Sequence, residues 1–506
     1  MSSKTNPLVL FPIDAIDWFY CQEYIAKGLM PNLQSLMNDS SYGVLKDKDS
    51  ICELGLFNIM FTGQSREEIG YYDFRQIIPG SYKLKNHVEG EDFGDDPFWS
   101  SYKGTDKKIC ILDVYDARIV NDVKGVQLAH WTLNNMKRNT IVYPETLADI
   151  YPELKIQLKC NQIIPADDAN SLHVFTNLLK RLDQKLETYS KIIQSEDFDF
   201  IAIGFGEAHC AGHQFFDYLN YSTENTDDNT KLILSEAIEK IYQKIDFLIG
   251  EFISILPEKS NIVVISNVGI DALYPYEMFI NRVCSVLGYQ VFKKKSLLQA
   301  VSPLNLGRKI VPLKVRYKLR RLFIDINKQD QDLANSFENS TDWSKTKIFA
   351  SPTFFNLYLR VNLKGREEQG IVDIKDYDEF VDKVCEQLKG FVDEETNQPI
   401  FKEIIKAKGV FSEDIPFNNP DILASFNSST NPVKSISHKE GYRIVQEENF
   451  FFRSTEHSEY GFFIAKGPDV KINGEIKNVN YRDIAPTLVN LAGIKNDVNY
   501  VGNIVF

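Results

Sequence analysis

Residues Phe198–Asp217, which read FDFIAIGFGEAHCAGHQFFD, begin with an apolar run typical of a buried β-strand. The run stops at Gly204 and Gly206, and His209 and His213 follow within a few positions. A strand that ends in glycines and then supplies polar side chains is how an α/β protein builds a site at the edge of its sheet. If the following segment is helical, the two histidines share one face and could hold one metal ion. The alternative is that both are ordinary histidines at a strand end.

Strands and helices are predicted to alternate along the whole chain. Apolar strands are expected at Leu8–Ile13, within Asp106–Tyr115 and at Asn261–Ser266. A long amphipathic helix is expected at Ser171–Ser195, and a further helix at Leu232–Ile255. This alternation predicts an α/β fold with a mostly parallel central sheet, helices on both faces, and insertions. We expect residues 1–300 and 345–506 to form the core together, residues 71–150 to contain cap or insertion elements, and residues 301–344 to form a basic and polar insertion.

Composition limits the possible partners. With 506 residues and 43% hydrophobic content, the chain can bury a large core. The net charge of −13 argues against binding to nucleic-acid polymers or anionic membranes. No signal peptide and no apolar run long enough to span a membrane is recognisable. The seven scattered cysteines predict reduced thiols and a cytoplasmic location.

Two further acidic positions are site candidates. Asp14 follows the first predicted strand, at the sheet edge where ligands bind in parallel sheets. Asp14 or Asp17 could instead cap the next helix, and since the two roles need different side-chain directions, the two residues could divide them. A helix expected at Ile51–Gly63 places Cys52 and Glu53 near its start, where the helix dipole favours an anion. Glu53 could equally be an ordinary first-turn glutamate, and Cys52 either reactive or merely buried.

The order of these pieces resembles the alkaline phosphatase superfamily, and most closely its type I phosphodiesterase/nucleotide pyrophosphatase branch. The resemblance rests on the following landmarks, in chain order: Asp14, Met30–Leu36, Thr62–Gly63, His209–His213, Ser266–Gly269, His457 and Asp483–Thr487. It implies phosphoryl chemistry at two metal ions, usually zinc, which polarise the phosphoryl group and activate a nucleophile.

The resemblance implies one usable metal site in this chain. His213 and His457 match histidine ligands of the family, and His209 stands where the family has an aspartate. Three histidines with one open position suit zinc. Glu207 is a possible fourth ligand or catalytic base. We therefore expect a divalent ion, with zinc as the expected metal and one ion rather than two.

The second metal site and the nucleophile position are altered. Asp14 matches the family's first aspartate ligand. The Asp-His pair of the family is replaced by Asn267, a weak amide ligand candidate, and by Val268, which cannot bind a metal. The nucleophile position falls on Glu53, which could act as base, nucleophile or ligand. Asp271 is a nearby spare carboxylate.

Two functions follow from the resemblance. The first is a metal-dependent hydrolase or transferase with a non-standard site, acting on a small anionic phosphate ester or phosphodiester such as a nucleotide-linked molecule. The alternative is a catalytically silent protein of the same fold that binds a ligand or partner through the same site.

Overall fold

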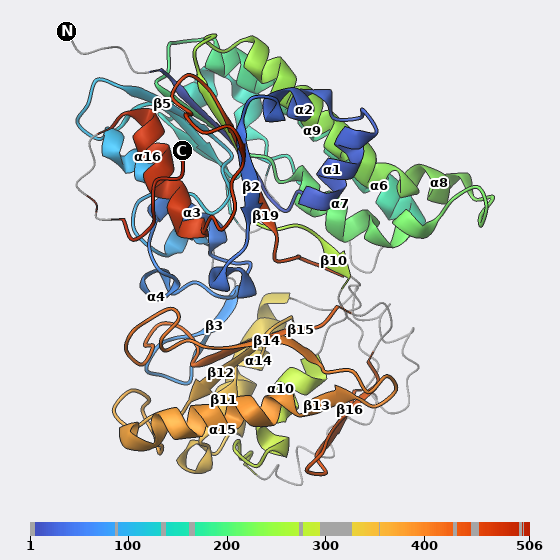
Figure 1. The fold of residues 1–506 in the computed structure, drawn as a ribbon, viewed down its shortest axis with the longest axis vertical. Coiled ribbons are helices and arrows are strands. Elements are labelled where there is room, and N and C mark those ends of the chain that lie inside the picture. The colour runs from blue at the N-terminus through green and yellow to red at the C-terminus, as the bar shows by residue number, and fades with distance from the viewer. Residues whose placement is uncertain are drawn as a thin grey trace. The chain divides into compact units, whose positions relative to one another are not determined.

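The computed structural model describes residues 6–506 apart from 87–89, 133–137, 161–166, 273–276, 294–325, 354, 429–432, 447–454, 495–497 and 499. The chain forms two compact units (Figure 1). The first contains residues 1–71, 89–272 and 453–506, and the second contains residues 72–88 and 273–452. None of the described helices has the length and apolar composition of a membrane span.

A nine-stranded sheet forms the centre of the first unit, in the order β20-β2-β19-β9-β1-β8-β5-β6-β7. Its strands are β1 (Leu8–Ile13), β2 (Ser41–Leu45), β5 (Lys108–Leu112), β6 (Lys124–Ala129), β7 (Ile141–Tyr143), β8 (Phe200–Ile203), β9 (Asn261–Ser266), β19 (Gly461–Lys466) and β20 (Gly474–Glu475). Neighbouring strands pair in parallel except at β19 and at the edge strand β7. The predicted mostly parallel sheet is therefore confirmed. Residues 71–150, expected to hold cap or insertion elements, supply β5, β6 and β7 to this sheet.

Helices cover both faces of the sheet (Figure 1). One face carries α2, α6, α7 and α9, which pack against one another, and the other carries α3 and α16. The helices of this unit are α1 (Trp18–Ala26), α2 (Pro31–Met37), α3 (Leu56–Thr62), α4 (Arg66–Ile69), α5 (Leu147–Ile150), α6 (Asp168–Ile193), α7 (Glu207–Phe215), α8 (Asn229–Ser235), α9 (Ala237–Ser254) and α16 (Ile484–Ala492). The helix expected at Leu232–Ile255 is thus two helices, α8 and α9.

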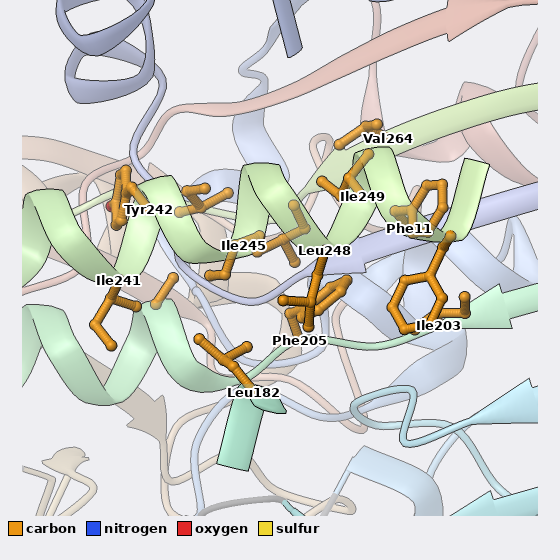
Figure 2. Close-up of a cluster of buried hydrophobic side chains, with 14 of the residues drawn as sticks. Phe11, Leu182, Ile203, Phe205, Ile241, Tyr242, Ile245, Leu248, Ile249 and Val264 are labelled. Atoms are coloured by element: carbon orange, nitrogen blue, oxygen red, sulfur yellow. The ribbon is translucent and has the colours of Figure 1, made fainter. Parts of the chain in front are cut away.

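The core follows from the sequence pattern. Every residue of β1 is buried, as expected for a central parallel strand covered on both faces. On α9, Ile238, Ile241, Ile245 and Ile249 recur at helical spacing and are fully buried. Figure 2 shows Ile241, Ile245 and Ile249 of this stripe beside side chains of β1, β8 and β9. The packed stripe fixes the strand ends from which the candidate site is built.

The second unit is built from smaller antiparallel sheets, in the orders β11-β12-β15-β14, β13-β16-β17 and β3-β4. Its elements are β3 (Arg75–Ile77), β4 (Leu84–Asn86), α10 (Glu277–Val286), α14 (Ile326–Ser340), β11 (Ile348–Ala350), β12 (Leu357–Val361), α15 (Tyr377–Lys389), β13 (Phe391–Asp393), β14 (Phe401–Lys406), β15 (Ile422–Phe426), β16 (Ser435–His438) and β17 (Arg443–Val445). Most of the predicted basic and polar insertion at 301–344 lies outside the described residues.

Candidate metal site

The carboxyl ends of β9, β1 and β8 lie side by side because these strands are neighbours in parallel. Each strand is followed by a residue that the sequence singled out: Asn267 after β9, Asp14 after β1, and His209 on α7 after β8. This edge of a parallel sheet is where α/β proteins bind ligands. The topology therefore brings together positions that are far apart in the chain.

Asp14 and Asp17 divide the two roles that the sequence left open. Asp17 is the N-cap of α1, and its Oδ1 accepts hydrogen bonds from the amides of Phe19 and Tyr20 at 2.9 and 3.1 Å. Asp14 makes no such cap: its buried Oδ2 lies 2.8 Å from Nδ1 of His209. Asp14 thus faces the histidines.

Three imidazoles converge at this edge. His209 and His213 lie one turn apart on α7, and His457 joins them from the segment before β19. Their ring centroids are 4.6–4.7 Å apart, and one ligand nitrogen from each lies within 4.8 Å of the others. Nε2 of His213 lies 2.8 Å from Nε2 of His457. Three neutral imidazoles in such a cluster form a donor set that fits zinc.

Two carboxylates border the cluster on the side of His457. Glu53 places Oε2 at 3.5 Å from Nδ1 of His457, and Glu456 places Oε1 at 3.8 Å from its Nε2. Glu456 belongs to the short strand β18 (Thr455–Glu456), which pairs with β10 (Asp271–Ala272). Ligand atoms of Glu53, Glu456 and His457 also lie within 4.8 Å of one another. Glu456 is not among the residues predicted from the sequence, although it directly precedes His457.

The prediction that a helix starts at Ile51 is wrong. The helix α3 starts at Leu56, so Cys52 and Glu53 lie in the turn before it. Gly55 has φ +83°, and a Cβ there would lie 2.7 Å from the carbonyl oxygen of Tyr71, so the backbone needs glycine at this point. Glu53 is therefore not a first-turn helix residue, and its carboxylate is held by a loop.

A buried arginine fixes that loop. The guanidinium of Arg66 donates to the backbone carbonyl oxygens of Asp49, Cys52, Leu54 and Tyr71 at 2.6–3.1 Å. Its Nε lies 3.4 Å from Oδ1 of Asp49. Because two of these carbonyls flank Glu53, Arg66 holds the main chain that positions this carboxylate. The sequence carried no signal for this role.

Glu207 has a different role from the predicted one. Its fully buried carboxylate pairs with Nη2 of Arg181 at 3.1 Å and with Nζ of Lys185 at 3.0 Å, both from α6. Burial alone would raise the pKa of Glu207, but Lys185 and Arg181 together hold it below its ordinary value. A carboxylate that is ionised and enclosed by two cations is unsuited to take up a proton or to bind a metal. We therefore correct its assignment as ligand or base.

Asn267 and Val268 do not extend the cluster. Oδ1 of Asn267 accepts from the amide of Ala15 at 3.1 Å, and Nδ2 donates to Oδ1 of Asp14 at 3.0 Å. Val268 is buried and has no ligand atom. The amide of Asn267, at the altered second site, thus bonds to Asp14.

One comparison with known proteins, the match to a family model, agrees with the resemblance. A family model described as Type I phosphodiesterase / nucleotide pyrophosphatase matches residues 8–451. Among solved structures, two of murine ectonucleotide pyrophosphatase / phosphodiesterase 5 are similar at 11% identity, covering 98% of this chain and 97% of theirs. Their TM-scores are 0.48, for an inactive variant in complex with AMP, and 0.47. No curated protein matches.

Proposed function

Because this chain belongs to the type I phosphodiesterase / nucleotide pyrophosphatase family, we propose that it is a metal-dependent enzyme that hydrolyses or transfers a phosphoryl group. The proposed substrate is a small phosphate ester or phosphodiester, and the family's name makes a nucleotide-linked molecule the first class to test. The observation that carries the proposal is the convergence of His209, His213 and His457 beside the carboxylate of Glu53.

The three histidines would hold one divalent ion, for which we propose zinc. When bound, such an ion supplies positive charge that polarises a phosphoryl oxygen and lowers the pKa of a water ligand. The side chains of His209 and His457 are 21% and 5% exposed, so the imidazoles are largely removed from competing water.

Glu53 is the residue that we propose for proton transfer or nucleophilic attack. Its side chain is 28% exposed, so a substrate or water can reach it, while Arg66 keeps its loop in place. As a base, Glu53 would accept the proton of an attacking water molecule. As a nucleophile, one carboxylate oxygen would bond to phosphorus as the alcohol leaves, and water would then hydrolyse the acyl phosphate.

One observation favours the alternative of a catalytically silent protein that binds a ligand or partner through the same site. Asn267 and Val268 stand where the resemblance implies a second pair of metal ligands. Against it, three histidines from two distant segments still meet in one cluster.

The test is metal content together with turnover. We expect the chelator-washed protein, reloaded with zinc, to carry about one ion per chain and to hydrolyse an aryl phosphodiester such as bis(p-nitrophenyl) phosphate. His213→Ala should lose both the ion and turnover while keeping the circular dichroism spectrum. His173→Ala, on the exposed face of α6, is the matched control and should keep both.

Absence of any bound ion under zinc, manganese and magnesium loading would refute the enzyme proposal. A bound ion without turnover of phosphate monoesters, diesters, sulfate esters or phosphonates would favour the silent alternative. The cytoplasmic location remains a proposal that rests on the odd number and scatter of the cysteines.

A further inference from the structure

The carboxylate of Asp14 is buried between two partners of different kinds. On one side Oδ1 accepts a hydrogen bond from Nδ2 of Asn267 at 3.0 Å. On the other side Oδ2 lies 2.8 Å from Nδ1 of His209. The side chain of Asp14 is 3% exposed, so these contacts replace most of its hydration.

The orientation of Asn267 is fixed by the main chain. Its Oδ1 accepts from the amide of Ala15 at 3.1 Å, and a backbone amide can only donate. The amide nitrogen of Asn267 must therefore be the group that faces Asp14. On this side, Asp14 therefore faces a neutral N–H donor. If position 267 carried a carboxylate instead, two negative charges would face each other and a cation would be needed between them.

The contact between Asp14 and His209 places two buried polar atoms within hydrogen-bonding distance of each other. Neither Oδ2 of Asp14 nor Nδ1 of His209 has a hydrogen-bond partner among the residues that the structure describes, and both atoms are buried. The two atoms are 2.8 Å apart, so a proton on Nδ1 of His209 can form a hydrogen bond to Oδ2 of Asp14 if the imidazole ring turns toward it. Poorly aligned polar contacts in ligand-free sites commonly improve in this way when a ligand binds. A proton on Nδ1 leaves the lone pair of His209 on Nε2.

We propose that Asn267, Asp14 and His209 form a relay in which Asp14 positions His209 as an Nε2 ligand and is not itself a metal ligand. Metal-bound histidines usually donate their second ring N–H to a carboxylate in this way. The proposal rests on the proposed function, because it assumes that the three histidines hold an ion. It deepens that function by assigning Asp14 and Asn267, two of the predicted metal ligands, to positioning roles in a site for one ion.

The test compares metal binding by full-length wild type, Asp14→Asn and Asp17→Asn. Zinc affinity is measured by competition with a chromophoric chelator, stoichiometry by elemental analysis, and ligand geometry by the visible absorption of the cobalt-loaded proteins. We expect Asp14→Asn to weaken zinc binding by about 10- to 100-fold while the stoichiometry stays at one and the cobalt spectrum keeps a tetrahedral intensity. Asp17→Asn should bind zinc like wild type, because Oδ1 of Asp17 caps α1, Oδ2 accepts from the amide of Ile270, and neither contact involves a histidine.

Three outcomes would overturn the relay. Two ions in wild type and one in Asp14→Asn would make Asp14 a ligand of a second ion while leaving the proposed function intact. Unchanged zinc affinity in Asp14→Asn would show that Asp14 does not act on His209. No ion in wild type would overturn the relay and the proposed function together. If Asp14→Asn folds poorly, Asn267→Ala provides a second measurement, because loss of its N–H to Asp14 should also weaken zinc binding at unchanged stoichiometry.

Discussion

Removal of Glu207 should destabilise the first unit strongly, because it leaves two buried cations without the carboxylate that pairs directly with both of them. Arg181 is 1% exposed and Lys185 is fully buried. Lys185 keeps one hydrogen bond, to the carbonyl oxygen of Gly204 at 2.9 Å, whereas the ion pair with Glu207 is the polar contact that the structure shows for Arg181. Breaking a buried ion pair by removing one partner costs about 3–5 kcal/mol. We therefore expect Glu207→Ala to lower the free energy of unfolding by about that amount.

The matched control is Glu187→Ala on α6, the helix that carries Arg181 and Lys185. Glu187 pairs with Lys191 at 2.8 Å, but both side chains are more than half exposed, so its loss should cost at most about 0.5 kcal/mol. Urea unfolding gives both values. Hydrogen exchange of peptides from α6 and α7, measured by mass spectrometry, locates the effect. A loss of about 3 kcal/mol in the free energy of unfolding accelerates exchange more than a hundredfold if exchange follows unfolding.

The contribution of Glu207 to the stability of the fold depends on pH in a defined direction. Because the folded-state pKa of Glu207 is lowered, its contribution to stability is present above the unfolded value near 4.5 and is lost as the pH falls through the lower folded-state pKa. If Glu207→Ala unfolds like wild type but loses turnover with its zinc retained, Glu207 is a catalytic base and the ion-pair argument is refuted.

Three further predictions concern the loop and the altered positions. Arg66→Lys should still bind zinc but lower kcat by about 10- to 100-fold, because one ammonium group cannot bond all four backbone carbonyls that hold the loop of Glu53. An unchanged kcat would refute the role of Arg66 in positioning Glu53. The triple variant Glu53→Thr, Asn267→Asp, Val268→His should bind a second zinc and raise phosphodiester hydrolysis, and a folded triple variant without either change would contradict the assignment of these positions. Burial, and next the charge of Asp49, raise the pKa of Asp47 to about 6. Stability should therefore fall as pH rises from about 4 to about 6, and thermal unfolding of Asp47→Asn should lack this fall.

The sheet could be predicted because its strands carry an uninterrupted apolar signal. The runs at Leu8–Ile13 and Asn261–Ser266 are strands with those same bounds, and the glycines after β8 mark the turn into α7. The position of His209 and His213 on one helix face also follows from their spacing. These features depend on local sequence, which a single chain displays directly.

The features that could not be predicted depend on contacts between distant segments. Nothing in the sequence of α6 shows that Arg181 and Lys185 point inward, since lysine and arginine are almost never fully buried unless paired. The late start of α3 depends on the close approach of Gly55 to the carbonyl oxygen of Tyr71, which leaves no room for a Cβ. His457 was found only through the family resemblance, because no local pattern connects it with α7.

The place of β19 in the sheet has a consequence for how the protein is made. β19 lies between β2 and β9, and both neighbours of β2, namely β19 and β20, come from the last part of the chain. A ribosome therefore completes β1, β8, β9 and the whole second unit while β9 still has an open edge and β2 has no partner strand. Such an edge is a site of aggregation, so we expect the nascent chain to need chaperones until β19 is made. His457 is synthesised just before β19, so the proposed three-histidine site is also incomplete until this stretch is made.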